Sequence, residues 1–133
     1  MPEINLVAVV VAAIASFVAS AIWYVIFGDW VARLQHAWRG APPADRPQAA
    51  EMAVFFGVQL VVAMVVAILI GMTDIAGPLE AAGLGLLLWV GFCATQWVGS
   101  IIGEGVPPRL AAIHAGDWLA HLLIITIIVG IWR

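Results

Sequence analysis

Residues 53–72 read AVFFGVQLVVAMVVAILIGM, a run of twenty residues without a charged side chain. A helix rises about 1.5 Å per residue, so this run is about 30 Å long, the thickness of a bilayer's hydrocarbon core. Residues 4–27, 79–102 and 110–132 are similarly long and almost as apolar. Because no backbone group can stay unpaired in lipid, we expect each run to be a helix. The sequence thus predicts an all-α integral membrane protein: four transmembrane helices in one domain, residues 1–133.

The composition of the whole chain agrees with this prediction. Of 133 residues, 65% are hydrophobic and 10% are charged, which excludes an ordinary soluble domain. The formal net charge of −3 provides no basic surface, so the expected partner is the lipid bilayer and not nucleic acid. The single cysteine, Cys93, cannot form a disulfide within the chain.

The arginines predict how the four helices are oriented. Four spans place both termini on one side of the membrane and the connections 28–52 and 103–109 on the other. Those two connections hold four of the five arginines: Arg33, Arg39, Arg46 and Arg109. Arginine-rich loops stay on the cytoplasmic side. We therefore expect both loops in the cytoplasm and both termini outside.

The first loop contains a further helical pattern. Residues 29–39 read DWVARLQHAWR, and Trp30, Leu34 and Trp38 recur every four residues on one helix face, with Arg33 off it. Tryptophan suits the headgroup level because its indole combines an apolar body with one N–H donor. We expect a short interfacial helix that anchors the loop to the membrane or, alternatively, recognises a lipid or a partner.

Small residues recur every fourth position on two of the spans. They are Ala12, Ser16 and Ser20 on the first span, and Gly91, Thr95, Gly99 and Gly103 on the third. Helices in lipid associate by close packing, and small side chains let their backbones approach. We expect both rows to be packing surfaces, either between helices of one chain or between subunits.

The fourth span carries three polar residues that form a ladder. His114, Asp117 and His121 are at positions i, i+3 and i+7, so they project from one side of a helix. Counted from Arg109, Asp117 lies roughly 12 Å deep. An aspartate near the centre of a membrane helix costs about 2.5–3.5 kcal/mol, so it normally faces the bundle interior and marks a candidate site. These three residues are called the polar ladder below.

Three interpretations of the polar ladder stay open. It can be structural, tying the fourth span to Gln96 or to the Trp97 indole on the third. It can be a proton or cation relay, because histidine titrates near neutral pH and Glu104 can feed it from the end of the third span. A histidine can also bind a metal ion or a porphyrin-type cofactor, with Asp117 orienting the ring. One helix supplies few ligands, so no cofactor is expected from the chain alone.

The chain also resembles a known family through short motifs along nearly its whole length. They are INLVAVVVAAIASF at residues 4–17, Ala21-Ile-Trp-Tyr24, Phe27-Gly28 with Trp30, Gly91-Phe92, Gly103-Glu104, and Ile113 with Ala115-Gly116. The family is an uncharacterised bacterial group of small four-helix inner-membrane proteins, a domain of unknown function. The resemblance implies a four-helix fold in a bacterial inner (plasma) membrane. It implies no activity, cofactor or catalytic residue.

The leading functional hypothesis from the sequence is a non-enzymatic membrane protein. The chain has no glycine-rich phosphate loop, no paired-cysteine motif, and no nucleophile with a base at readable spacing. We expect a homo-oligomer or an accessory subunit of a larger membrane assembly, with the polar ladder buried against a neighbour. The alternative is a small proton- or cation-coupled transporter or channel that uses the ladder. A second alternative is a membrane binder of a metal or a porphyrin-type cofactor.

Overall fold

A computed structural model of the chain describes residues 2–40 and 48–132. The helices are α1 (Leu6–Arg39), α2 (Gln48–Gly71), α3 (Pro78–Leu88), the π-helix η1 (Trp89–Ala94), α4 (Thr95–Glu104) and α5 (Pro108–Ile131). The elements α3, η1 and α4 follow one another without a break and form one third helix of 27 residues. The all-helical fold is confirmed, with four helices long and apolar enough to cross a membrane.

Local sequence signals fix where the helices begin and end. The Asn5 side chain accepts hydrogen bonds from two backbone N–H groups in the first turn of α1, which satisfies donors that have no partner within the helix. Gly40 ends α1 at φ 78° and Gly105 ends α4 at φ 70°, a left-handed conformation that glycine adopts without a steric penalty. Pro78 and Pro108 open the third helix and α5, where the missing N–H is not needed.

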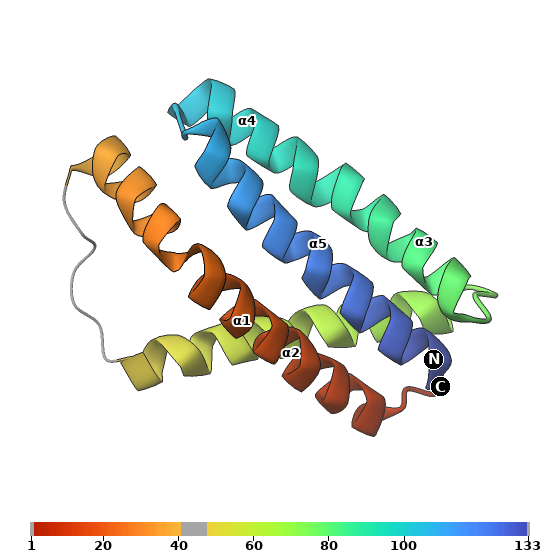
Figure 1. Cartoon of the computed structure of the whole chain (residues 1–133). Helices are drawn as coiled ribbons and strands as arrows, with labels where there is room; N and C mark the ends of the chain where they lie inside the picture. The colour runs from red at the N-terminus through yellow and green to blue at the C-terminus, as the bar shows by residue number, and fades with distance from the viewer. Residues whose placement is uncertain (1, 41–47, 133) are drawn as a thin grey trace.

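The helix α5 is the centre of the bundle. It lies between α1 and the third helix, and α2 crosses it and α1 at an angle (Figure 1). The start of α1, the end of α5 and the turn from α2 to α3 lie at one end of the molecule. The end of α1 and the turn from α4 to α5 lie at the other. Which of these ends faces the cytoplasm stays a prediction from the arginines.

The tightest packing is in the half of the bundle that holds the start of α1. There α1, α2 and α5 meet through fully buried small residues, among them Ala12 and Ala63. The third helix approaches α5 equally closely: a Cβ placed on Gly85 would lie 2.6 Å from Oγ1 of Thr126 and 3.0 Å from the carbonyl oxygen of Leu122. Such contact between backbones is how helices associate where hydrophobicity cannot drive them together.

The segment predicted as a separate interfacial helix, residues 29–39, belongs to α1. This helix runs for 34 residues, about 51 Å, and a single Gly28 is too weak a helix breaker to end it. Leu34 and Trp38 pack against the turn from α4 to α5 around Leu110. The spacing that suggested a membrane-facing stripe is thus partly a contact with α5.

The other two anchor residues remain accessible. Trp30 is 50% exposed, and the guanidinium of Arg33 lies 5.9 Å from the centre of its ring, within the range of a cation–π contact. These two side chains are free to meet the lipid headgroups, so their anchoring role stays a prediction.

The two rows of small residues have different surroundings. On α1, Ala12 and Ser16 are fully buried between helices. On the third helix, Gly91, Thr95, Gly99 and Gly103 are all exposed, and a Cβ on any of the three glycines would meet nothing within 4 Å. We call these four residues the outer row. It does not pack within the described chain, because the third helix uses another face toward α5 and η1 shifts the helical phase midway.

Candidate intramembrane binding site

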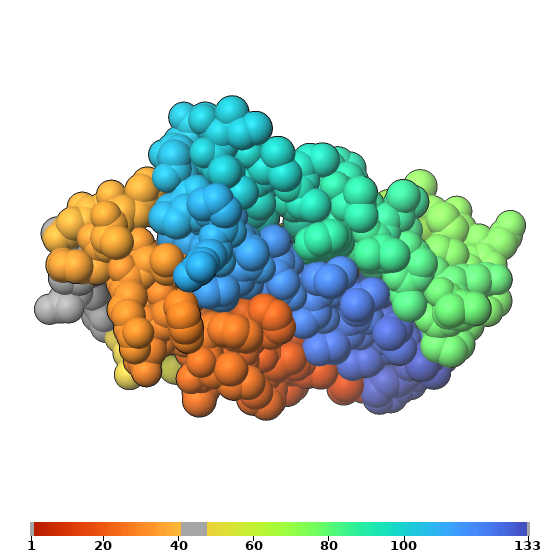
Figure 2. Space-filling view, turned by 45° about the horizontal axis from the view of Figure 1, so that its top comes forward, coloured from red at the N-terminus to blue at the C-terminus, as the bar shows by residue number. Residues whose placement is uncertain are grey.

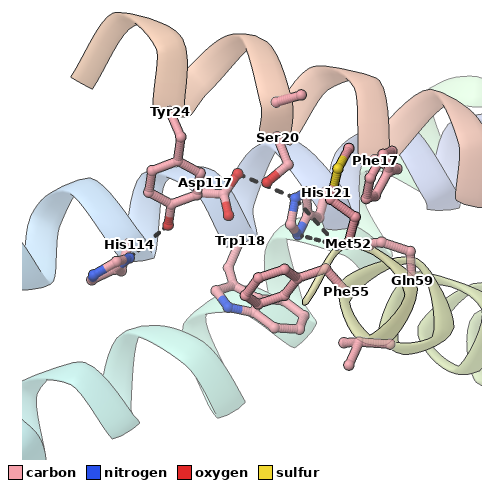
Figure 3. A pocket seen from close by; sticks show the side chains of 12 residues that line it. Phe17, Ser20, Tyr24, Met52, Phe55, Gln59, His114, Asp117, Trp118 and His121 are labelled. Atoms are coloured by element: carbon pink, nitrogen blue, oxygen red, sulfur yellow. Dashed lines mark hydrogen bonds and ion pairs between the residues drawn. The ribbon is translucent and has the colours of Figure 1, made fainter. Parts of the chain in front are cut away.

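A cavity of about 610 Å³ lies between α1, α2 and α5. It forms where α1 and α2 diverge beyond their crossing, toward the arginine-rich end of the bundle (Figure 1). Its lining residues are Phe17, Ser20, Ala21 and Tyr24 from α1, Met52, Phe55, Val58 and Gln59 from α2, and His114, Asp117, Trp118 and His121 from α5. Figure 3 shows these side chains converging from three helices, so the whole polar ladder faces one cavity.

Asp117 is the decisive residue of this cavity. Its side chain is buried, with only 4% of the residue exposed. Nε2 of His121 lies 3.1 Å from Oδ1 of Asp117, but the two groups are not aligned for a hydrogen bond. No other donor in residues 2–40 and 48–132 reaches this buried oxygen. A buried oxygen without a hydrogen-bond donor destabilises the protein unless a proton, a cation or a donor binds to it.

His121 is held by a chain of polar groups from two other helices. Nε2 of Gln59 lies 3.0 Å from Nδ1 of His121, and the Ser16 hydroxyl donates to Oε1 of Gln59 at 3.1 Å. If the Gln59 amide donates to Nδ1, the neutral ring carries its hydrogen on Nε2, the atom that faces Asp117. The network therefore orients the imidazole toward the carboxylate.

His114 is fixed by a second set of contacts. The Tyr24 hydroxyl lies 2.6 Å from Nδ1 of His114, and Tyr24 lines the cavity together with Asp117. From the third helix, the Trp97 ring stacks on the imidazole with centres 5.2 Å apart and planes 15° apart. Tyr24 thus connects α1 to the first member of the polar ladder.

Two tryptophans hold the segment of α5 that carries the ladder. The Trp23 indole N–H donates to the carbonyl oxygen of Ile113 at 3.0 Å, and the Trp89 indole N–H donates to that of Ala115 at 2.7 Å. The Trp23 ring lies so close to Gly116 that a Cβ there would be 2.7 Å from it. The backbone just before Asp117 is therefore held from two sides, by α1 and by the third helix.

The structure brings together only part of the predicted site. The polar ladder shares one cavity, and Ser20, predicted for packing, lines it as well. Gln96 and Glu104 are exposed and lie outside the cavity, whereas Trp97, the other residue expected to tie the ladder to the third helix, stacks on His114. Within the chain, α1 and α2 already line the cavity around the ladder; whether a neighbouring subunit also covers it stays a prediction.

The sequence interpretation missed the two residues that contact the ladder histidines from other helices, Tyr24 and Gln59. Tyr24 is the single tyrosine of the chain, and Gln59 is the one strongly polar side chain in residues 53–72. In lipid a buried polar group needs a partner, so a lone polar residue in a span is a signal that it pairs with another span. That rule would have pointed to both residues, although not to their specific partners.

The three ladder residues do not form a metal-ligand set. Within the described part of the chain, no group of three or more His, Cys, Asp or Glu side chains is placed to hold a metal ion. His114 and His121 are two helical turns apart, about 10 Å along the axis. Their ring nitrogens face Tyr24, Gln59 and Asp117, so the geometry does not favour the metal interpretation.

Comparison with known proteins identifies the family of the chain. No curated protein and no solved structure gives a significant match. A family match does cover residues 7–130, which is nearly the whole chain and includes all four helices and every residue of the cavity. The chain therefore belongs to the family described as "Protein of unknown function (DUF1761)".

Proposed function

We propose that this chain is a non-enzymatic membrane protein that binds a proton and a cationic ligand in turn at Asp117, and so acts as a small proton- or cation-coupled transporter. The observation that carries the proposal is Oδ1 of Asp117, which is buried, without a hydrogen-bond donor among the described residues, and next to a cavity of about 610 Å³. A carboxylate in a membrane span without a full set of partners is the usual mark of an ion pathway or binding site.

The neighbours of Asp117 support the exchange of a proton for a cation. Nε2 of His121 lies 3.1 Å from Oδ1 of Asp117, and Tyr24 lines the same cavity. A proton that leaves Asp117 can pass by way of the Tyr24 hydroxyl to Nδ1 of His114, which lies 2.6 Å from that hydroxyl. A cation that enters the cavity would take the place of the proton and leave the site electrically neutral.

The position of the cavity also fits such a role. Asp117 is nine residues from Pro108, about 14 Å along α5, so the site lies between the arginine-rich end and the middle of the membrane. We place that end on the cytoplasmic side of a bacterial inner membrane. The site then exchanges ligands more readily with the cytoplasmic half of the bilayer in the conformation described here.

A flux experiment tests this function. The purified protein is reconstituted into liposomes with an internal pH-sensitive dye, and proton movement is recorded after a pH gradient is imposed, with and without an organic cation outside. We expect flux in the wild type and none in Asp117→Asn. Glu104→Gln, which removes an exposed carboxylate outside the cavity, should behave as the wild type. No flux under any gradient, or equal flux in Asp117→Asn, would contradict the proposal.

A second candidate function is assembly with another membrane subunit, which one observation favours. The outer row faces away from the rest of the molecule, on the third helix, which lies along the outer side of α5 (Figure 2). Rows of this kind allow close helix association in membranes. In lipid nanodiscs, Gly99→Leu should lower the measured mass of any homo-oligomer, with Gly83→Leu, at another exposed glycine, as the control. A monomeric wild type that also co-purifies with no other membrane protein would rule out this role.

A further inference from the structure

We infer that the ligand of the cavity is an amphipathic organic monocation, a protonated or quaternary amine with a bulky apolar body. This inference rests on the proposed function and names its substrate class. The first argument is charge. Asp117 is the one carboxylate among the lining residues, and none of them is arginine or lysine. A single buried carboxylate neutralises one positive charge, whereas a dication would leave an uncompensated charge and an anion would be repelled.

The lack of oxygen ligands argues against an inorganic cation. Hard metal cations need several oxygen atoms around them, and the lining residues that could provide side-chain oxygens are Asp117, Ser20, Tyr24 and Gln59. Oε1 of Gln59 already accepts from Ser16, and Tyr24 is engaged with His114. An ammonium group needs less: one carboxylate and aromatic surfaces are enough to hold it.

Aromatic rings supply those surfaces. Phe17 and Tyr24 on α1, Phe55 on α2 and Trp118 on α5 all line the cavity. The indole of Trp118, on the residue directly after Asp117, reaches the neighbourhood of His121 with ring centres 5.3 Å apart. A carboxylate bordered by aromatic rings attracts organic cations, because each ring presents negative charge density on its face.

The size and the polarity gradient of the cavity define the rest of the ligand. A volume of about 610 Å³ is typical of sites for drug-sized molecules, and a bare ammonium group fills only a small part of it. The polar groups gather around Asp117 and include Ser20, Tyr24 and Gln59 from the other two helices, while Ala21, Val58 and the phenylalanines form the remaining wall. The ligand must therefore bring apolar surface of its own to exclude lipid and water from that part.

The entrance of the cavity suits a molecule that arrives from the bilayer. Met52 and Phe55 both line the cavity and are exposed, Phe55 by 60%. They lie on α2, which diverges from α1 in this part of the bundle (Figure 1), so we expect a ligand to enter between these two helices. Amphipathic cations concentrate in the interfacial region of a membrane, which brings them to the level of this mouth.

The binding of one matched pair of ions and of one smaller cation tests the inference. Tetraphenylphosphonium and tetraphenylborate have similar size and apolar surface but opposite charge, and benzyltrimethylammonium is a smaller cation. Equilibrium dialysis with the full chain in mild detergent should show saturable binding of at least one cation. Asp117→Asn should weaken it about thirtyfold or more, because a buried charge pair is lost. Phe55→Ala should weaken it about threefold.

Controls keep the outcome clear. Phe92→Ala removes an exposed ring from η1, outside the cavity, and should leave binding unchanged. If Asp117→Asn does not fold, Phe55→Ala and the binding of tetraphenylborate to the wild type, measured in a separate sample, still decide. Binding of neither cation, equal affinity in the variants, or equally tight binding of the borate would overturn the inference. Asp117-dependent proton flux without cation binding would refute the ligand class alone, whereas cation binding without flux would refute transport alone.

Discussion

Replacing Asp117 by Asn should make the ligand-free protein more stable. The side chain keeps its shape and loses its charge, and Oδ1 at present has no hydrogen-bond donor among the described residues. A buried polar group without a partner costs roughly 1–3 kcal/mol. The variant no longer buries a charge at this place, and its Oδ1 can stay 3.1 Å from Nε2 of His121 while the hydrogen bond between Gln59 and Nδ1 is kept. We expect a gain of about 1–2 kcal/mol in the free energy of unfolding.

The opposite result is expected if Asp117 has a structural role. If its carboxylate formed a fully compensated ion pair with His121, the substitution would leave one member of a buried pair alone. Breaking such pairs costs about 3–5 kcal/mol. The sign of the change in the free energy of unfolding thus distinguishes two roles. A gain indicates a ligand-binding site that lowers the stability of the empty protein, and a loss indicates a contact that stabilises the bundle.

Thermal and SDS unfolding in mild detergent, followed by tryptophan fluorescence, measure this difference. Trp23, Trp89, Trp97 and Trp118 all contact or flank the ladder segment of α5, so their emission reports on its packing. Glu104→Gln is the matched control, and a surface substitution of that kind should change stability by less than about 0.5 kcal/mol. A clear loss of stability in Asp117→Asn, or no change from the wild type, would refute the reasoning.

Two further substitutions test the packing and the second half of the polar network. Gly85→Ala should lower the free energy of unfolding by about 1–3 kcal/mol relative to Gly99→Ala. The new methyl group would lie 2.6 Å from Oγ1 of Thr126, whereas a methyl group at Gly99 meets nothing within 4 Å. Equal SDS unfolding curves for the two variants would contradict this close contact. Tyr24→Phe removes the hydroxyl that lies 2.6 Å from Nδ1 of His114 and should cost about 0.5–1.5 kcal/mol in the same assay. It should also slow proton flux in liposomes without abolishing it, and an unchanged rate would exclude Tyr24 from the proton path.

The sequence was sufficient to predict those features of the fold and the site that depend on a single helix. Length and apolarity were enough for the four helices, and the spacing of His114, Asp117 and His121 was enough to place them on one side of α5. Their partners depend on how α1 and α2 rotate and cross. The sequence of a single span does not determine that geometry, so Tyr24 and Gln59 were not predicted as partners of the ladder.

Two patterns in the sequence show why regular spacing does not identify the contact partner. The outer row has the regular spacing of a packing surface, yet η1 shifts the helical phase in the middle of the third helix, and the row faces away from α5. Trp30, Leu34 and Trp38 have the spacing of an independent amphipathic helix. Tyr24, Val31 and Trp38 are seven residues apart, however, so one face of α1 continues past the span and reaches the start of α5. Periodicity identifies a face but not the neighbour that it meets.

The two halves of α5 explain how one small bundle combines stability with an open polar site. In its second half, α5 meets α3 through glycines at Gly85 and Gly130, where added methyl groups would collide with Thr126 and Ala81. In its first half, α1 and α2 separate, and the room between them holds the polar ladder. A change in the angle between α1 and α2 would alter access to Asp117 while leaving the α3–α5 contact intact. The closely packed half thus holds α5 in place, and the separation of α1 and α2 in the other half leaves room for the cavity.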